Sequence, residues 1–288
     1  MPIDFACPHC GKQTRVADQY AGTAGNCAAC GQPISIPGVA KSTGSSSSTT
    51  TTVIIVVAVC LLGVCVVGGI LAALLIPAVG SARDAAQRMS CMNNLKQISL
   101  AMHNYHDVYK CFPAAYIEDE NGKPMHSWRV ALLPFLDRPD LYDRYNFNEP
   151  WNSPANMALA AEMPDVFRCP KGAPLGSPMT NYVVVIGDKT MFSPNRWCKM
   201  SDIRDGTSNT LMVVETTSPV HWLEPANDLR FDRMSRQINS GPQSISSNHR
   251  MTANVAAADG SVHALSNDLP PEVLESLLNI ADGRVVSF

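Results

Sequence analysis

Charged residues are scarce in this chain of 288 residues, at 16%, and no segment is strongly basic. The formal net charge is −3. Residues 1–41 contribute a net charge of +1, which leaves −4 for the remainder. Proteins that bind nucleic acid normally carry a basic stripe that neutralises phosphates. The sequence therefore predicts no nucleic-acid partner.

The C-terminal region also lacks a serine or cysteine nucleophile motif and a phosphate-binding loop. His249 and Asp259 are the residues there that most invite a catalytic role. However, an acid that precedes a glycine in a hairpin turn, as Asp259 precedes Gly260, ordinarily serves the backbone. We therefore predict structural roles for both residues and no enzymatic activity. Metal ligation is the first alternative, and catalysis is the second.

Ten cysteines are present, and four of them form two Cys-x2-Cys pairs near the N-terminus. Cys7 and Cys10 are separated from Cys27 and Cys30 by sixteen residues, a spacing typical of zinc ribbons. Each pair lets one tight turn aim two thiolates at a common point, and a glycine follows each pair. About forty residues bury too little apolar surface to fold alone. We predict a structural Zn²⁺ site in a zinc ribbon over residues 1–38.

Residues 39–52 are rich in serine and threonine, which is typical of a flexible linker. Residues 53–76 then contain no charge and are almost wholly Val, Ile, Leu, Ala, Cys and Gly. As a helix they would reach about 36 Å, more than the roughly 30 Å hydrocarbon core of a bilayer. A cleaved signal peptide would begin at the N-terminus and be shorter. We predict one transmembrane helix and the lipid bilayer as a partner.

Two arguments about membrane orientation disagree. Arg83 and Arg88 closely follow the span whereas only Lys41 lies close before it, so the positive-inside rule places the C-terminal side in the cytosol. Zinc-binding thiolates instead belong in a reducing compartment. We give the second argument more weight. It predicts an inner (cytoplasmic) membrane protein with a cytosolic N-terminus and an extracytoplasmic head.

An amphipathic helix is predicted over residues 77–110, continuous with the span. The apolar residues recur at steps of three or four. After it, short Val-rich runs bounded by turn residues predict strands. Asp259-Gly260 predicts a hairpin between residues 254–258 and 261–265, and residues 270–279 predict a short closing helix. The fold class is therefore α+β, with an antiparallel head over residues 111–288. The helical stripe consists of Val79, Ala82, Ala86, Met89, Met92, Leu95, Ile98, Met102 and Tyr105.

Several motifs resemble one family of proteins. They include Ile76-Pro77-Ala78-Val79, Cys91-Met92-Asn93-Asn94-Leu95-Lys96-Gln97-Ile98, Ser127-Trp128-Arg129-Val130, Asp205-Gly206-Thr207-Ser208-Asn209-Thr210, and His249 followed after nine residues by Asp259-Gly260. This ordered set, over about residues 70–265, resembles the planctomycete pilin-like proteins called domain of unknown function 1559. The resemblance implies a pilin-like plan, with one long helix under a globular head. It implies no established activity.

The chain departs from this family at the start of the span. Members commonly begin there with a Gly-Phe-Thr-Leu-Val-Glu type processing site. Here Thr51-Thr52-Val53-Ile54-Ile55 stands in its place, without the glutamate that belongs to pilus assembly. We therefore expect a permanent anchor that keeps its zinc ribbon.

Four cysteines of the C-terminal region are candidates for disulfide bonds. An unbroken helix would keep Cys91 about 30 Å from Cys111, too far for a bond. Two pairings remain open, in which Cys91 and Cys111 each join one of Cys169 and Cys198. Free buried thiols are the alternative.

Calcium is a weaker candidate ligand of the head. Oxygen ligands lie around a glycine turn, but their spacing matches no recognised calcium loop. Turn and capping hydrogen bonds therefore explain them better. These residues are Asp202, Asp205, Asn209 and Glu215.

These observations favour a pilin-like envelope protein with a structural or binding head. Its expected partners are other envelope or pilin-like proteins. One alternative is an envelope metal-dependent enzyme that uses His249 and Asp259. The other is a signalling adaptor whose zinc ribbon recruits a cytosolic protein. The four tryptophans are expected to pack in the core or in loops rather than to form sugar-binding platforms.

Overall fold

A computed structural model describes residues 2–38, 47–193, 196–249, 252–284 and 286. The chain divides into two compact units, Met1–Leu74 and Leu75–Phe288. Residues 39–46 of the predicted linker lie outside the described residues, and the last part of that linker, from Ser47, already belongs to a helix. The mixture of helices and antiparallel sheets confirms the α+β class.

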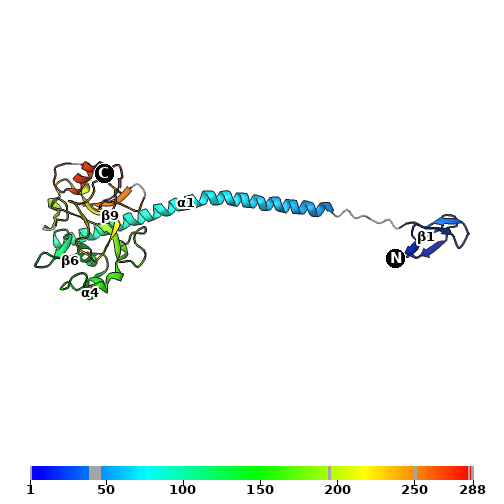
Figure 1. The fold of residues 1–288 in the computed structure, drawn as a ribbon, viewed down its shortest axis with the longest axis horizontal. Coiled ribbons are helices and arrows are strands. Elements are labelled where there is room, and N and C mark those ends of the chain that lie inside the picture. The colour runs from blue at the N-terminus through cyan, green and yellow to red at the C-terminus, as the bar shows by residue number, and fades with distance from the viewer. Residues whose placement is uncertain (1, 39–46, 194–195, 250–251, 285, 287–288) are drawn as a thin grey trace. The chain divides into compact units, whose positions relative to one another are not determined.

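The N-terminal unit begins with two small hairpins (Figure 1). Strand β1 (Ile3–Ala6) pairs antiparallel with β2 (Gln13–Val16), and β3 (Ala24–Asn26) pairs antiparallel with β4 (Pro33–Ser35). A 3-10 turn, η1 (Asp18–Tyr20), connects them. Among residues 2–38, the buried side chains are those of Cys7, Cys27 and Ile36. Such a small core needs additional stabilisation.

One helix, α1 (Ser47–Tyr109), contains both the apolar segment and the predicted amphipathic segment. It continues through Pro77 and ends before Lys110, which adopts a left-handed φ of 60°. Its most apolar 18 residues have a mean hydropathy of 3.1, and none of them is buried. This helix is therefore long and apolar enough to cross a membrane.

A four-stranded antiparallel sheet forms the centre of the head, in the order β12-β11-β9-β7. Its strands are β7 (Met179–Val183), β9 (Leu211–His221), β11 (Thr252–Ala257) and β12 (Val262–Ser266). Gly260, at φ +85°, turns β11 into β12. The predicted hairpin at Asp259-Gly260 is thus confirmed.

Two hydrophobic cores lie on the two faces of this sheet. Alternation along each strand sends Val213 toward the core that contains α1, and Val214 toward the core that contains α5 (Pro271–Leu278). The head therefore has three layers, with the end of α1 on one face and the closing helix on the other. Figure 1 shows the strands of the head gathered around the end of α1.

Shorter elements surround these layers. A parallel pair joins β8 to β10, and a hairpin joins β5 to β6. The bounds are β5 (Tyr116–Glu118), β6 (Pro124–Ser127), α2 (Trp128–Ala131), η2 (Leu133–Phe135), α3 (Pro139–Arg144), α4 (Pro154–Met157), η3 (Ala160–Glu162), η4 (Asp165–Phe167), β8 (Val185–Ile186), η5 (Met200–Asp202), η6 (Thr207–Asn209) and β10 (Leu229–Arg230).

The apolar stripe of α1 is buried over only part of its length. Val79 and Met89 are exposed, whereas Leu95, Ile98 and Met102 have no exposed area. The head core contacts α1 only from Cys91 onward, because the strands and loops of the head cover only the C-terminal part of this helix. Val79, Ala82, Ala86 and Met89 belong to the same stripe but are exposed.

Candidate functional site

The four N-terminal cysteines lie in two turns of the same design. In each, the glycine after the second cysteine donates its N–H to the carbonyl of the first, over 2.9 Å for Gly11 to Cys7 and 2.8 Å for Gly31 to Cys27. Both glycines adopt a positive φ, at 66° and 69°. These conformations are easy for glycine and strained for other residues. The glycine that follows each cysteine pair thus supplies the positive φ of its turn.

The sulfur atoms of these turns converge. Cys7 Sγ lies 3.9 Å from Cys30 Sγ, and Cys10 Sγ lies 3.9 Å from Cys27 Sγ. All four sulfurs lie within 4.8 Å of one another. Tetrahedral zinc with bonds of about 2.3 Å places its sulfur ligands roughly 3.8 Å apart. The four cysteines therefore fit a metal ion of this size, with no fifth position supplied for a substrate.

Backbone dipoles favour the ionised form of one of these thiols. The N–H groups of Ala29 and Cys30 point at the sulfur of Cys27 and lower the pKa of this thiol to about 6. A thiolate is the form that binds metal. The turn thus favours the thiolate form of Cys27, which is the form that binds metal, near neutral pH.

The residues of the C-terminal signature do not act as one site. His249 is buried in the loop before β11, and its Nε2 lies 3.3 Å from Cys91 Sγ. Asp259 is exposed in the hairpin turn, where its Oδ1 accepts hydrogen bonds from Ser261 N at 2.8 Å and Ser261 Oγ at 2.6 Å. Asp259 thus serves the backbone turn, and Gly260 supplies its positive φ.

A second group of metal-binding side chains surrounds His249. Cys91, Cys169, Glu215 and His249 are all buried, and one ligand atom from each lies within 4.8 Å of the other three. Cys91 comes from α1, Cys169 follows η4, and Glu215 lies on β9. The sequence alone did not predict this group, because its members come from four separate segments.

The Glu215 carboxylate is the most unusual member. Its side chain is 1% exposed, and Asn254 donates to Oε2 from its backbone N at 3.1 Å and its Nδ2 at 3.0 Å. The other oxygen, Oε1, has no hydrogen-bond partner. Burial raises the pKa of this carboxyl, while hydrogen bonding by Ser247, Asn254 and Cys91 lowers it. Burial has the opposite effect on His249, whose pKa it lowers. The nearby Lys171 and Arg88 lower the pKa of His249 further.

The four head cysteines fall into two neighbourhoods. Cys91 Sγ lies 2.9 Å from Cys169 Sγ, and Phe112, next to Cys111, donates its N–H to the carbonyl of Cys198 at 2.8 Å. Of the two pairings left open, the structure therefore favours Cys91 with Cys169. All four thiols are unbridged in the structure.

The oxygen ligands considered for calcium do not gather. The Asp205 carboxylate accepts the N–H groups of Asp282 at 2.6 Å and Gly283 at 2.9 Å, which ties down the segment after α5. Asp202 accepts the N–H of Lys199 at 2.9 Å. Among the described residues, no metal-binding group combines Asp202 or Asp205 with Glu215.

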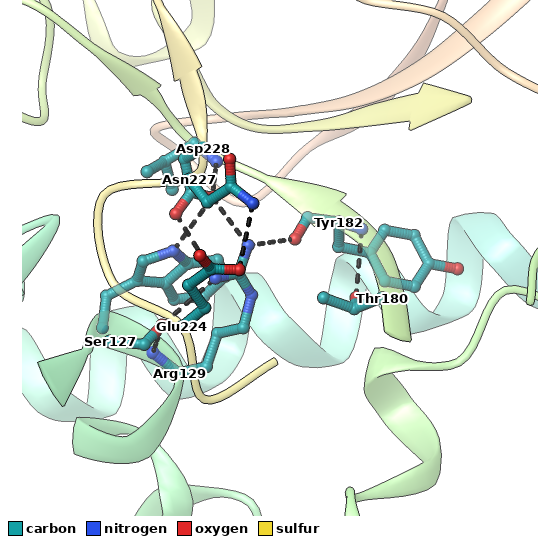
Figure 2. A network of polar contacts seen from close by, with 9 residues as sticks. Ser127, Arg129, Thr180, Tyr182, Glu224, Asn227 and Asp228 are labelled. Carbon is teal, nitrogen blue, oxygen red and sulfur yellow. Dashed lines mark hydrogen bonds and ion pairs between the residues drawn. The ribbon is translucent and has the colours of Figure 1, made fainter. Parts of the chain in front are cut away.

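A buried ion pair explains the Ser127-Trp128-Arg129-Val130 motif (Figure 2). Arg129 Nη2 lies 2.6 Å from Asp228 Oδ1, and neither side chain has exposed area. Arg129 also donates to the Tyr182 carbonyl at 2.8 Å, and Asp228 Oδ1 accepts the N–H of Val184 at 3.0 Å. Ser127 caps α2 by accepting from Arg129 N at 3.3 Å. The network joins α2, β7 and the loop before β10. We therefore assign it a structural role in holding these elements of the head together.

The tryptophans do not form a shared platform. Trp128 and Trp222 are fully buried, Trp151 is half-buried, and Trp197 is 65% exposed. The expectation of packing roles is met by the first three.

Comparison with family models identifies a family that matches the head. The model described as "Protein of unknown function (DUF1559)" matches residues 80–190 and 174–237, which together cover more than half of the chain. Neither the curated proteins nor the solved structures contain a significant match. The matched region includes Cys91, Cys169, Glu215, Arg129 and Asp228, and it excludes the N-terminal cysteine cluster.

Proposed function

The chain belongs to the family described as "Protein of unknown function (DUF1559)", and from this premise we propose that it is a pilin-like protein of the cell envelope. Residues 53–76 hold it in the inner membrane as a single span. The head acts outside the cytoplasm as a structural or binding module without catalytic activity, and other envelope or pilin-like proteins are its partners.

The observation that carries this proposal is the division of α1 into an exposed apolar part and a buried part. From Val53 to Ile76 every side chain is exposed, yet Leu95 and Ile98 are buried completely. Exposed apolar surface of this extent is stable in lipid and not in water. The same helix thus belongs to the membrane at one end and to the protein core at the other, which is the pilin plan.

The N-terminal unit is proposed to bind one Zn²⁺ through Cys7, Cys10, Cys27 and Cys30 on the cytosolic side. The 3.9 Å separations of the sulfurs support this metal, because they match tetrahedral thiolate geometry. The ion would supply folding free energy that the small core cannot. Reduced thiolates are maintained in the cytosol, which supports the proposed orientation.

Site-directed labelling tests this orientation. Leu175 in the head is 94% exposed and Tyr20 in the N-terminal unit is 49% exposed, so Leu175→Cys and Tyr20→Cys place reporters on the two sides of the span. Spheroplasts are treated with a membrane-impermeant maleimide before and after lysis, and the wild-type chain serves as the background control. We expect Leu175→Cys to gain label in intact spheroplasts and Tyr20→Cys to gain it only after lysis. The opposite pattern would overturn the orientation, and it would do so without affecting the membrane anchor itself.

A further inference from the structure

We propose that Cys91, Cys169, Glu215 and His249 form a second metal site, inside the head, for a divalent ion of the zinc class. The donor set is two sulfurs, one imidazole nitrogen and one carboxylate oxygen. All four donors lie within 4.8 Å of one another, which is the compactness that a single ion requires. Thiolate and imidazole together favour zinc over calcium or magnesium.

Burial of Glu215 is the independent observation that points to a cation. A carboxylate removed from water is costly unless a positive charge or several hydrogen bonds compensate it. Asn254 satisfies Oε2 only, and Oε1 has no hydrogen-bond partner. A metal ion among the four donors accounts for this unpaired oxygen.

The surroundings suit a site that carries negative charge. Two thiolates and one carboxylate around a divalent ion leave a net charge of −1. Arg88 donates to Asn254 Oδ1 at 3.3 Å, and Asn254 in turn donates to Glu215. This cation offsets part of the remaining negative charge, whereas the nearby Lys171 is paired with Asp84 at 2.8 Å.

A disulfide between Cys91 and Cys169 is the competing explanation. Their sulfurs are 2.9 Å apart, closer than the roughly 3.8 Å expected of two zinc ligands, so metal binding requires them to separate slightly. A disulfide, however, accounts for only two of the four residues. It leaves the buried Glu215 without a cation and His249 without a partner for Nε2 other than an oxidised sulfur. The metal accounts for all four.

Such a site is structural rather than catalytic. All four ligands come from the protein, and each is at most 5% exposed, so no position remains for substrate or water. Its ligands connect α1, the segment after η4, strand β9 and the loop before β11. The ion would thereby fasten the helix to the sheet, and His249 of the C-terminal signature gains a defined role.

Metal analysis of the full chain tests the site. The chain carries Cys10→Ser and Cys30→Ser to remove the N-terminal site, is expressed with added zinc, and is purified in detergent without chelators. Elemental analysis is expected to give about one zinc per chain, with a further loss to near zero in Glu215→Gln and in His249→Ala. Glu215→Gln preserves shape and so limits unfolding. Cys198→Ser, which removes a buried head thiol outside the group, is the matched control and is expected to retain the ion.

Cobalt substitution and peptide mapping keep the test decisive. In the same background, cobalt is expected to produce the visible absorption of a thiolate-bound ion, and this absorption disappears in Glu215→Gln while intrinsic fluorescence still reports a folded head. Zinc-free protein in which non-reducing digestion yields a linked Cys91–Cys169 peptide would overturn the proposal in favour of a disulfide. Retention of the full metal content in Glu215→Gln would overturn the assignment of Glu215 as a ligand.

Discussion

Arg129 and Asp228 form an ion pair of 2.6 Å in which both side chains are completely buried. Loss of one partner leaves the other charge buried without compensation, which typically costs about 3–5 kcal/mol. We therefore expect Arg129→Met to lower the free energy of unfolding of the head by roughly this amount. The measurement is urea denaturation of the detergent-solubilised chain, followed by tryptophan fluorescence. All four tryptophans lie in the head, so the signal reports this unit.

The matched control for this prediction is an ion pair at the surface. Arg144 Nη2 lies 2.6 Å from Glu162 Oε1, the same separation, but the side chains are 51% and 36% exposed. Solvent screening leaves such exposed pairs with little effect on stability. Arg144→Gln is therefore expected to change stability little. Equal losses in the two variants would show that burial does not set the strength of the Arg129–Asp228 pair.

The N-terminal cluster makes a second prediction, about metal content. Replacement of Cys7 by serine removes one of four sulfurs and is expected to lower the zinc content of the wild-type chain by about one ion, because structural zinc sites need all four ligands. Cys60→Ser changes a cysteine of the exposed apolar segment and is expected to leave the content unchanged. Elemental analysis of both purified variants provides the measurement. An equal zinc content in the two would rule out the N-terminal site.

The apolar segment predicts how the chain partitions between membrane and water. A chain without residues 53–76 is expected in the soluble fraction, whereas a chain without residues 1–38 is expected to remain with the membranes after an alkaline wash. The reason is that residues 53–76 expose apolar surface throughout and the first 38 residues do not. Immunoblots of the fractions are the measurement. If the first deletion also stayed with washed membranes, the head would need a second means of attachment.

The buried His126 predicts a pH dependence of stability. Its Nδ1 lies 3.0 Å from the hydroxyl of Tyr145, and its Nε2 lies 3.0 Å from the carbonyl of Phe147. Burial lowers its pKa below the ordinary value of 6.5, although the Phe147 carbonyl opposes this effect. The unfolded chain therefore binds the proton more readily than the folded chain, so stability present above pH 6.5 is lost as the pH falls through this value.

Denaturation at a series of pH values from about 5 to about 8 checks this dependence, because the ordinary pKa of histidine lies within that range. The decline at low pH is expected to be shallower in His126→Gln than in the wild-type chain. It will not vanish, since burial also lowers the pKa of His221 and His249. Identical slopes for variant and wild type would contradict the assignment to His126.

Features coded by local sequence were predictable. The two Cys-x2-Cys turns, the helix that ends at Tyr109, and the hairpin at Asp259-Gly260 each depend on residues close together in the chain. The closing helix, predicted over residues 270–279, was found as Pro271–Leu278. In each case the spacing of apolar residues or turn formers carries the signal.

The buried group around His249 was not predictable in the same way. Cys91 and Cys169 are 78 residues apart, and Cys91 and His249 are 158 apart, so no local spacing relates them. Glu215 was considered only with nearby oxygen ligands, yet its partner Asn254 is on the adjacent strand β11. Strand pairing in three dimensions brings these residues together, and a single sequence does not contain that pairing.

The burial of α1 from Cys91 to Met102 has a mechanical consequence. A force that pulls on the exposed apolar end of this helix, along the helix axis, releases the head only if the buried side chains slide out of the core together. Such a set of side chains resists traction better than contacts that peel apart one by one. The head is therefore suited to bear tension that is applied along α1.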